Sequence, residues 1–275
     1  MKYYGLIGGK LSHSLSPVIH KFIFDAIGIV SDYELFAADS SDVESKIRSL
    51  KSDGLCGLNV TIPYKKSVMA YLDEISYEAK RIGAVNTVVV KDTKLEGYNT
   101  DYFGFKAMLE HYEVEIVDKK VYVLGTGGSA NSVVAFLLDS GVKKVTLVSR
   151  NLSTNSNFAN EVEIIDYNEL KNHQGDVLVN TTPVGMYPNI SECAVGDVEI
   201  KNFSTLVDLI YNPEETVFLQ KGRILEKKTV GGLYMLVAQA VKAQEIWQNR
   251  PIDKKIITNI YNQVNQFLNH EDKLL

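Results

Sequence analysis

The feature that most constrains the fold is a glycine-rich turn in the middle of the chain, directly after a run of four apolar residues, 121–124. Gly125, Gly127 and Ala130 stand at the spacing G-x-G-x-x-A, and residues 132–138 then supply an apolar helical face. A strand, a glycine turn and a helix in that order form the context of the dinucleotide-binding fingerprint. The sequence therefore predicts a nucleotide-binding α/β unit around this turn.

Each small residue of the turn has its own physical role. Gly125 permits the tight turn, Gly127 lets the backbone approach a pyrophosphate, and Ala130 allows close packing of helix against strand. Amide groups at the start of the helix would point at the phosphates, where the helix dipole favours negative charge. An ordinary strand-to-helix turn can have the same spacing, so the motif has to be read with its surroundings.

Length and composition are those of an ordinary globular protein. The chain has 275 residues, 45% of them hydrophobic and 23% charged, and this length suits two domains. A formal net charge of −5 gives no reason to expect nucleic acid or an anionic membrane as a partner. Cys56 and Cys193 are isolated, which favours a reducing cytoplasm, and we find no signal peptide or membrane-spanning run. The five histidines are scattered, so we expect no metal site.

Near the N-terminus, a short strand over residues 3–7 leads into a helix that we expect to begin at Pro17. The predicted buried stripe of this helix is Ile19, Phe22, Ile23, Ala26 and Ile27. Ser16 suits the N-cap of the helix, and that role would be purely structural. However, Ser12, Ser14 and Ser16 place hydroxyls beside a helix N-terminus, an arrangement that can bind a small carboxylate.

Residues 57–62 alternate between apolar and polar side chains, so Asn59 and Thr61 share one face of a predicted strand. Pro63 ends this strand, and Lys65 follows just beyond its carboxyl end. Ligands bind at that end of the strands in α/β sheets. Each of these side chains could by itself be a solvated surface group. Their grouping at one strand end favours a ligand site.

Two further polar residues accompany the next pair of predicted strands. Asn86 lies among apolar neighbours in a strand over residues 84–90, where an amide must be hydrogen-bonded and is either a structural latch or a ligand contact. Asp101 ends a strand over residues 97–101, before a helix. Taken alone, Asp101 is typical of a helix N-cap.

The second half of the chain repeats strand and helix in regular units. Further strands are predicted at 145–148, 163–165, 176–180, 205–210 and 229–230. Strands separated by crossovers predict a parallel, doubly wound sheet. The predicted second strand of this half ends at Ser149, Arg150 and Asn151, without the acid that usually binds the ribose 2′-hydroxyl of NAD. An arginine there favours the 2′-phosphate of NADP, unless Arg150 is merely a solvated loop residue.

Two amphipathic helices close the chain, one over residues 233–247 and one over residues 256–267. We expect both to pack back on the first domain, which would then be discontinuous. The predicted fold is an α/β protein of two domains with a cleft between them. The predicted boundaries are 1–101 plus 238–275 for the substrate-binding domain and 102–237 for the Rossmann-like domain.

The ordered series of motifs resembles the shikimate dehydrogenase family along almost the whole chain. The carriers are Ser14-Leu-Ser16-Pro17 after Gly5-Leu-Ile-Gly8, Asn59-Val-Thr61-Ile-Pro63-Tyr-Lys65, Gly83-Ala-Val-Asn86-Thr, Gly97-Tyr-Asn99-Thr-Asp101, Gly125-Thr-Gly127-Gly128, Asn180-Thr-Thr-Pro-Val-Gly-Met186, Asp208-Leu-Ile-Tyr211-Asn-Pro213 and Gly232-Leu-Tyr-Met235-Leu-Val-Ala-Gln239-Ala. The resemblance implies reversible, metal-free reduction of 3-dehydroshikimate to shikimate with NADPH in aromatic amino-acid biosynthesis. We expect the protein to be cytoplasmic, as a monomer or a homodimer.

The same resemblance implies roles for individual residues. Lys65 and Asp101 would form the catalytic pair, and Ser14 and Ser16 would hold the substrate carboxylate. The ring hydroxyls would be contacted by Asn59, Thr61, Asn86, Asp101, Tyr211 and Gln239. NADP would be bound by Gly125, Thr126, Gly127, Gly128, Ser129, Ala130, Ser149, Arg150, Asn151, Thr181, Thr182, Pro183, Val184, Gly185, Met186, Leu209, Gly232 and Met235.

The chain departs from the family pattern at two places. Lys10 stands where proline is common, and the second arginine that often follows the position of Arg150 is absent. The second departure bears on the choice of cofactor. One alternative is therefore a quinate/shikimate dehydrogenase that uses NAD. A catalytically silent, ligand-sensing regulator on the same fold is another, although the presence of both Lys65 and Asp101 argues against it.

Overall fold

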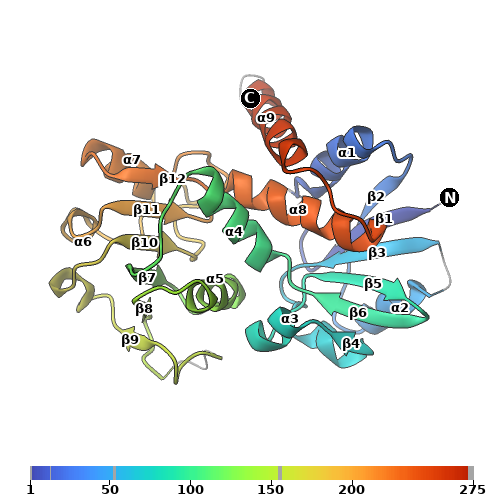
Figure 1. Ribbon diagram of the computed structural model, residues 1–275, viewed down its shortest axis with the longest axis horizontal. Helices are drawn as coiled ribbons and strands as arrows, with labels where there is room; N and C mark the ends of the chain where they lie inside the picture. The colour runs from blue at the N-terminus through green and yellow to red at the C-terminus, as the bar shows by residue number, and fades with distance from the viewer. Residues whose placement is uncertain (1, 13, 52–53, 154–156, 272–275) are drawn as a thin grey trace. The chain divides into compact units, whose positions relative to one another are not determined.

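The computed structural model describes residues 2–12, 14–51, 54–153 and 157–271, and the chain divides into two compact α/β units. The first unit comprises Met1–Gly104 with Val237–Leu275, and the second comprises Phe105–Leu236. Each unit is built on its own six-stranded sheet (Figure 1). The two-domain α/β fold expected from the sequence is therefore confirmed.

The sheet of the first unit is mixed, in the order β2-β1-β3-β5-β6-β4. Its strands are β1 (Tyr3–Gly8), β2 (Asp32–Ala37), β3 (Leu55–Val60), β4 (Glu74–Ile75), β5 (Thr87–Lys91) and β6 (Lys94–Tyr98). Strands β2, β1 and β3 are parallel, whereas β5 and β6 form an antiparallel hairpin beside β3. The carboxyl ends of β1 and β3 therefore lie beside the start of β5, at the same end of the strands.

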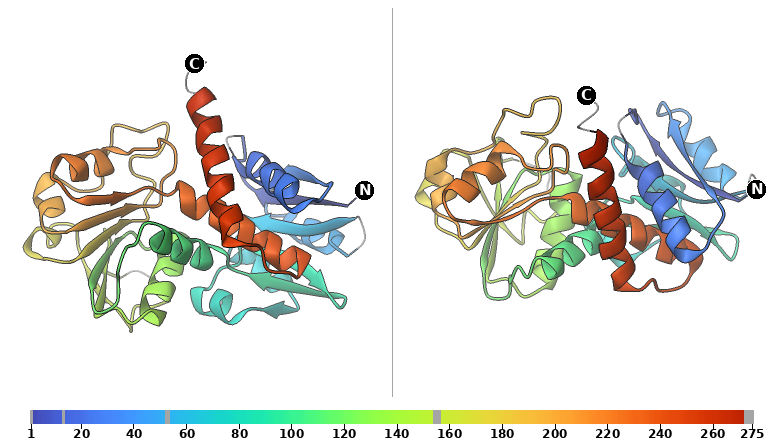
Figure 2. Two further views of the ribbon diagram at one scale, coloured as in Figure 1. Left: turned by 45° about the horizontal axis from the view of Figure 1, so that its top comes forward. Right: turned by 90° about the horizontal axis from the view of Figure 1, so that it is seen from above.

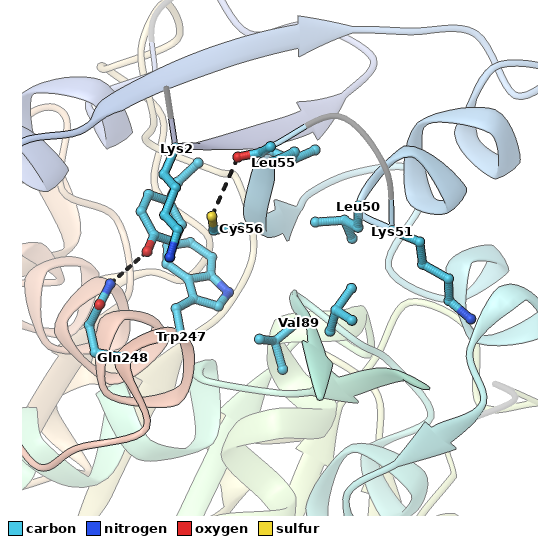
Figure 3. A pocket seen from close by; sticks show the side chains of 11 residues that line it. Lys2, Leu50, Lys51, Leu55, Cys56, Val89, Trp247 and Gln248 are labelled. Carbon is cyan, nitrogen blue, oxygen red and sulfur yellow. Dashed lines mark hydrogen bonds between the residues drawn. The ribbon is translucent and has the colours of Figure 1, made fainter. Parts of the chain in front are cut away.

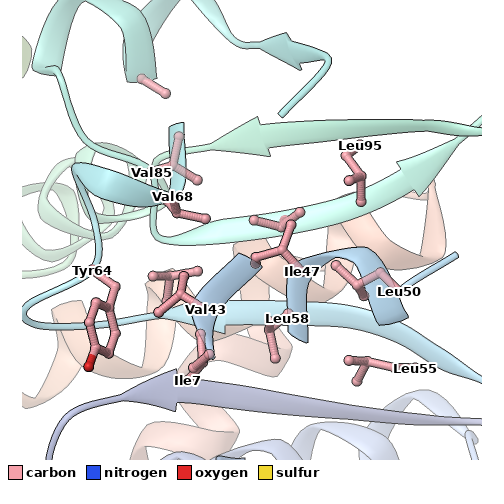
Figure 4. Close-up of a cluster of buried hydrophobic side chains, with 13 residues drawn as sticks. Ile7, Val43, Ile47, Leu50, Leu55, Leu58, Tyr64, Val68, Val85 and Leu95 are labelled. Atoms are coloured by element: carbon pink, nitrogen blue, oxygen red, sulfur yellow. The ribbon is translucent and has the colours of Figure 1, made fainter. Parts of the chain in front are cut away.

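Helices cover both faces of the first sheet. They are α1 (Ser16–Ile27), α2 (Val43–Ser49), the 3-10 turn η1 (Ser67–Tyr71), α3 (Tyr77–Ile82), the start of α4 (Asp101–His111), most of α8 (Leu233–Gln248) and α9 (Lys254–Glu271). On one face, Val43 and Ile47 of α2 pack against Leu58 of β3 in a cluster of buried apolar side chains (Figure 4). On the other face, the Trp247 indole Nε1 of α8 donates to the Val88 carbonyl at 3.0 Å. Helix α9 lies beside α1 in both views of Figure 2.

The sheet of the second unit is entirely parallel, in the order β12-β11-β10-β7-β8-β9. Its strands are β7 (Lys120–Leu124), β8 (Lys144–Val148), β9 (Glu163–Ile165), β10 (Val177–Asn180), β11 (Thr205–Asp208) and β12 (Lys228–Val230). The helices are α5 (Gly128–Asp139), the 3-10 turn η2 (Leu170–Asn172), α6 (Asp197–Lys201) and α7 (Val217–Ile224). Strand order reverses between β7 and β10, which is the switch point at which doubly wound sheets bind nucleotides.

The differences from the sequence-based expectations lie mainly at element ends. Helix α1 begins at Ser16, and Leu15 occupies the N-cap position without a side-chain cap bond, so the capping role expected of Ser16 is wrong. Strand β3 ends at Val60, because the chain turns at Thr61, whose carbonyl accepts from the Tyr64 amide at 2.9 Å. Ile62 is therefore 75% exposed instead of lying on a buried strand face.

In two helices the buried residues differ from the predicted stripes. In α1 the buried side chains include His20 and Phe24, while Ala26, expected to be buried, is exposed. His20 stacks on Tyr33 with ring centroids 4.1 Å apart, so this side of α1 packs on aromatic groups that the period of apolar residues could not show. In α5 every residue from Ala130 to Leu137 is buried, so burial is not confined to one helical face.

No helix in the described ranges of the chain is long and apolar enough to span a membrane.

Candidate active site

An ion pair lies at the edge of the first sheet where the carboxyl ends of β1 and β3 meet the start of β5. Lys65 follows the turn after β3, and Asp101 is the first residue of α4, immediately beyond β6. The Lys65 Nζ lies 2.6 Å from Asp101 Oδ2, and the two side chains are 19% and 12% exposed. A partly buried ion pair with access to solvent can transfer a proton, and the charged hydrogen bond between its members keeps the two side chains in a fixed orientation. The structure thus brings together the two residues predicted to be catalytic.

Asn86 holds the second oxygen of this carboxylate. Its Nδ2 donates to Asp101 Oδ1 at 2.9 Å, and its Oδ1 accepts from the Thr100 amide at 2.7 Å. Asn86 is 3% exposed, and it precedes β5 instead of lying within the strand. Of the two roles considered for this amide, the structural latch is therefore present, and the remaining hydrogen of Nδ2 can still serve a ligand. Asn99 Oδ1 also accepts from the Asp101 backbone amide at 3.1 Å, which fixes the start of α4.

Asn59 lies behind this pair, on the face of β3 that is turned towards α8. Its Nδ2 donates to the Asn86 carbonyl at 3.1 Å and to Thr87 Oγ1 at 3.0 Å. Its Oδ1 accepts from the Tyr33 hydroxyl at 2.8 Å. Both hydrogens of the amide are used, so Asn59 can bind a substrate hydroxyl only as an acceptor.

His20 belongs to the buried support of this region. Gln244 Nε2 of α8 lies 2.9 Å from His20 Nδ1, and the histidine is 1% exposed. Burial lowers the pKa of His20 to about 3, so the ring is neutral near neutral pH. Burial also raises the pKa of Tyr33, which therefore keeps the proton that it donates to Asn59.

The other predicted substrate residues divide between the two units. Ser14, Ser16, Thr61 and Gln239 are half-buried residues of the first unit. The Ser14 hydroxyl accepts from the Ser16 amide at 3.3 Å, and Gln239 Oε1 lies 3.2 Å from Thr100 Oγ1. Tyr211 belongs to the second unit, in the loop after β11, where burial raises the pKa of its hydroxyl. The sequence prediction did not include Tyr33, Thr87 or Thr100, although buried threonines next to Asn86 and Asp101 could have indicated the last two.

A pocket of about 400 Å³ lies elsewhere in the first unit (Figure 3). It is lined by Lys2, Tyr4, Leu55, Cys56, Trp247 and Gln248, among others. These residues surround the amino ends of β1 and β3, whereas Lys65 and Asp101 follow the carboxyl ends of their strands. The pocket and the ion pair therefore lie at opposite ends of the strands.

The predicted cofactor residues of the second unit gather at the carboxyl ends of its strands. Residues 125–130 follow β7, residues 149–151 follow β8, residues 181–186 follow β10, Leu209 follows β11 and Gly232 follows β12. Met235 lies in the first turn of α8 and is 7% exposed. The Thr181 hydroxyl donates to the Leu124 carbonyl at 2.6 Å, which ties the loop after β10 to the end of β7.

The glycine turn has the space that a dinucleotide needs. Gly125 has a φ of +99°, which favours glycine, and a Cβ there would lie 3.0 Å from Thr182 Cγ2. At Gly127 and Gly128 an added Cβ would meet nothing within 4 Å, so the backbone at the start of α5 is open to a ligand. Ala130 is fully buried where helix and strand pack together. These residues fit a bound pyrophosphate.

Arg150 is an exposed side chain just after β8, next to Ser149, whose hydroxyl donates to the Asn151 carbonyl at 2.8 Å. Burial raises the pKa of the half-buried Tyr167 hydroxyl, and the positive charge of Arg150 nearby offsets part of that rise. In the part of the chain that the structure describes, Arg150 has no ion pair. A guanidinium at this place can bind a 2′-phosphate.

Asp208, at the end of β11, is a buried carboxylate that the sequence analysis assigned no role. It accepts from Asn180 Nδ2 at 3.0 Å, from the Ile210 amide at 3.0 Å and from the Thr216 hydroxyl at 2.7 Å. Asn180 in turn accepts from the Thr182 amide and hydroxyl. Asp208 thereby links the loops after β10 and β11, both of which carry predicted cofactor residues. Burial raises its pKa to about 6.

Comparison with known proteins identifies the family. Residues 6–88 match the family model for the shikimate dehydrogenase substrate binding domain, and residues 108–202 match the one for shikimate / quinate 5-dehydrogenase. A protein of Clostridium beijerinckii named shikimate dehydrogenase (NADP(+)) is 50% identical over 95% of this chain and 97% of its own. The chain belongs to the shikimate dehydrogenase family.

Solved structures of the family agree with this assignment. Shikimate dehydrogenase 1 from Peptoclostridium difficile superposes with a TM-score of 0.89 at 46% identity, covering 96% of this chain and 98% of that one. Shikimate 5-dehydrogenase from Thermus thermophilus, solved with NADP(H) and shikimate, has a TM-score of 0.86 at 28% identity, over 96% of this chain and 99% of that one. The resemblance that the sequence motifs indicated is thus confirmed. Within the described residues, no three His, Cys, Asp or Glu side chains gather as a metal site would require.

Proposed function

We propose that this protein is an NADP-dependent shikimate dehydrogenase that reversibly reduces 3-dehydroshikimate to shikimate in aromatic amino-acid biosynthesis. The observation that carries the proposal is the Lys65–Asp101 ion pair, 2.6 Å long and held on its second oxygen by Asn86, in a family whose relatives have this name. We assign catalysis and all the proposed substrate contacts except that of Tyr211 to the first unit, and NADP binding to the second.

The chemistry needs one proton in addition to a hydride. When bound, NADPH supplies the hydride to the substrate carbonyl carbon. The Lys65 ammonium donates a proton to the carbonyl oxygen, which becomes the new hydroxyl, and in the reverse direction neutral Lys65 takes that proton back. Asp101 orients the Lys65 amine and the reacting hydroxyl together. Ser14 and Ser16 bind the carboxylate, while Asn59, Thr61, Asn86, Tyr211 and Gln239 bind the ring hydroxyls.

Residues of the second unit hold the cofactor. The open backbone at Gly127 and Gly128 supports a pyrophosphate contact, and the exposed Arg150 supports a preference for the 2′-phosphate of NADP. The loop 181–186 and Leu209, Gly232 and Met235 border the nicotinamide in this proposal. Free Cys56 and Cys193 support a cytoplasmic location, and a monomer or a homodimer is proposed as the oligomeric state.

A direct assay tests the proposal. Purified protein is mixed with shikimate and either NADP or NAD, and the absorbance of reduced nicotinamide is followed. We expect turnover with NADP that exceeds turnover with NAD. No turnover with either cofactor would contradict the proposal that this protein is an enzyme.

A second candidate function rests on the match of residues 108–202 to shikimate / quinate 5-dehydrogenase. If the protein is a quinate/shikimate dehydrogenase, quinate will replace shikimate in the same assay, and NAD will serve at least as well as NADP.

A further inference from the structure

Thr87 is a fully buried hydroxyl within the hydrogen-bonded surroundings of the ion pair, and it makes no proposed contact with substrate. It is the first residue of β5 and is 0% exposed. Its Oγ1 lies 3.0 Å from Asn59 Nδ2 and 3.0 Å from Asn86 Oδ1. Thr87 therefore bridges two side chains that we propose to bind the substrate.

Backbone groups fix the orientation of both amides on either side of Thr87. The Asn59 side-chain Nδ2 donates to the Asn86 backbone carbonyl, which can only accept. Asn86 Oδ1 accepts from the Thr100 backbone amide, which can only donate. Neither side chain can turn its amide over without losing a buried hydrogen bond.

The direction of the Thr87 hydroxyl follows from these two constraints. It accepts from Asn59 Nδ2 and gives its single hydrogen to Asn86 Oδ1 at 3.0 Å, which is closer than the other possible acceptor, Thr100 Oγ1 at 3.4 Å. Hydrogen bonds therefore all point one way along a row, from Tyr33 to Asn59, Thr87, Asn86 and Asp101. Bonds aligned in this manner strengthen one another at low local dielectric. The row ends on the carboxylate oxygen opposite the one that Lys65 binds.

We infer that Thr87 is a positioning residue for proton transfer, whose hydroxyl holds the Asn86 amide against Asp101 and thereby keeps the Lys65–Asp101 pair in its working orientation. This inference rests on the proposed function of the pair. Asn86 can then act on a substrate hydroxyl only as a donor, and Asn59 only as an acceptor.

The neighbouring Thr100 hydroxyl cannot replace Thr87 without a cost. Its Oγ1 lies 3.2 Å from Asn86 Oδ1 and 3.2 Å from Gln239 Oε1, and it has one hydrogen to give. Without the Thr87 hydroxyl, Thr100 must leave either Asn86 or Gln239 without that hydrogen. Loss of the Thr87 hydroxyl therefore disturbs the site whichever partner Thr100 chooses.

Three variants test the inference. Thr87→Val keeps the shape of the side chain and removes the hydroxyl, and Thr87→Ser keeps the hydroxyl. Thr146→Val is the matched control, because Thr146 is also 0% exposed and its hydroxyl donates to Glu163. Both residues belong to the second unit, and we assign neither of them a cofactor contact. For each protein we would measure kcat, KM, the pH dependence of kcat and Tm.

We expect Thr87→Val to lower kcat about tenfold, the loss that one net hydrogen bond corresponds to, and to displace the pH dependence of kcat. Thr87→Ser should stay within about twofold of the wild type, and Thr146→Val should change only Tm. A Thr87→Val enzyme that loses Tm but keeps kcat and its pH dependence would overturn the inference. So would a Thr87→Ser enzyme as impaired as Thr87→Val.

A second measurement does not depend on turnover. It therefore distinguishes failure of this inference from failure of the proposed function. The environment of the Lys65 amine can be followed by NMR, through the chemical shift of its ε-carbon at one pH, in wild type, Thr87→Val and Thr87→Ser. We expect this chemical shift to change in Thr87→Val alone. Identical chemical shifts in all three proteins would overturn the positioning role even if the wild type turned over shikimate normally. A changed chemical shift in a protein without turnover would contradict the proposed function only.

Discussion

The two units organise their candidate sites by different means. In the first unit the site is made of side chains bonded to one another, with the Lys65–Asp101 pair supported by Asn86, Thr87 and Asn59. In the second unit it is made of backbone at strand ends, with open space at Gly127 and Gly128. A side-chain network fixes donors and acceptors for one small molecule. Exposed backbone amides, in contrast, can donate hydrogen bonds to any phosphate of suitable shape. We therefore expect specificity for the substrate to be concentrated in the first unit.

The two units also bury titratable groups of opposite kind. The first buries His20 as a neutral ring with a pKa of about 3, and the second buries Asp208 with its pKa raised to about 6. Burial penalises the charged form in both cases. Acid therefore acts on the stability of the two units in opposite directions, which provides a way to address each unit separately.

The largest expected effect is on the proton donor of the first unit. Lys65→Ala should lower kcat by about 10²–10⁴-fold with KM much less affected, because the lost group acts in the transition state. Steady-state kinetics with shikimate and NADP measure this. Lys66→Ala is the matched control and should be nearly neutral. If Lys66→Ala were inactive and Lys65→Ala active, the wrong lysine would have been assigned.

The next effect concerns the stability of the first unit in acid. Between pH 6.5 and about 3 the unfolded chain protonates His20 and the folded protein does not, so stability is present above pH 6.5 and is lost as the pH falls. The loss should reach about 2–5 kcal/mol. Urea unfolding followed by the fluorescence of Trp247, the single tryptophan of the chain, reports on this unit.

His20→Phe, which keeps a ring against Tyr33 but cannot protonate, should flatten this pH dependence. His270→Gln, at an exposed position, is the control and should retain it. An equally steep loss of stability in His20→Phe would mean that another group of the first unit is responsible.

Asp208 should give the opposite slope in the second unit. Its folded pKa lies above the unfolded one, so the folded state holds an extra proton between pH 4 and about 6, and stability falls as the pH rises through that range. The expected change is about 1–3 kcal/mol. Asp208→Asn should abolish it, since the amide can still meet Asn180, Ile210 and Thr216. Urea midpoints by circular dichroism from pH 4 to 7 measure the difference, and parallel curves for both proteins would contradict the assignment.

A smaller effect tests the cofactor side of the comparison. Arg150→Ala should weaken NADP about tenfold to a hundredfold and leave NAD little changed, because one charge-assisted phosphate contact is lost. Binding titrations with both cofactors check this, with Lys143→Ala, also exposed, as control. Equal weakening of NADP and NAD would show that Arg150 does not bind the 2′-phosphate.

The smallest effect separates binding from structure at the start of α1. Ser16 makes no cap bond, but its side chain hydrogen-bonds the buried Tyr33 hydroxyl, so Ser16→Ala should raise KM for shikimate about fivefold, equivalent to about 1 kcal/mol, and lower Tm by less than the loss of a cap would. Ser14 accepts from the Ser16 amide, so Ser14→Ala should raise KM and also lower Tm slightly. Unchanged KM in both variants would remove this pair from the carboxylate site.

Much of the fold could be predicted because periodicity and turn chemistry are local. Strands β7 to β12 follow apolar runs, and the glycine turn after β7 has the spacing and the positive φ at Gly125 that the motif requires. Element ends were less predictable. Ser16 is a favourable cap by residue type, but the helix begins one residue earlier than expected, and a cap depends on backbone geometry that residue type does not reveal.

The candidate site was predictable where motifs mark it and not where tertiary contacts build it. Lys65, Asn86 and Asp101 stand at strand ends, and the structure brings them within hydrogen-bonding distance. The roles of Tyr33 and Asp208 could not be predicted from the sequence, because their hydrogen-bond partners, Asn59 and Asn180, are distant in the sequence. Such pairings arise only when the sheet is assembled. The roles of the predicted site residues stay predictions until the variants above are measured.

The Trp247 contact on β3 has a consequence for the order in which the protein can be made. The indole covers Gly57 so closely that a Cβ there would lie 2.3 Å from its Nε1, and Gln244 of the same helix bonds His20. A ribosome releases the strands β1 and β3 well before α8. Residues 105–236 form a continuous unit that can close its sheet during translation. The side of the first sheet that carries Gly57 is only partly covered, by α1, until α8 emerges, so a chaperone that protects the nascent chain has the uncovered part of this face to shield.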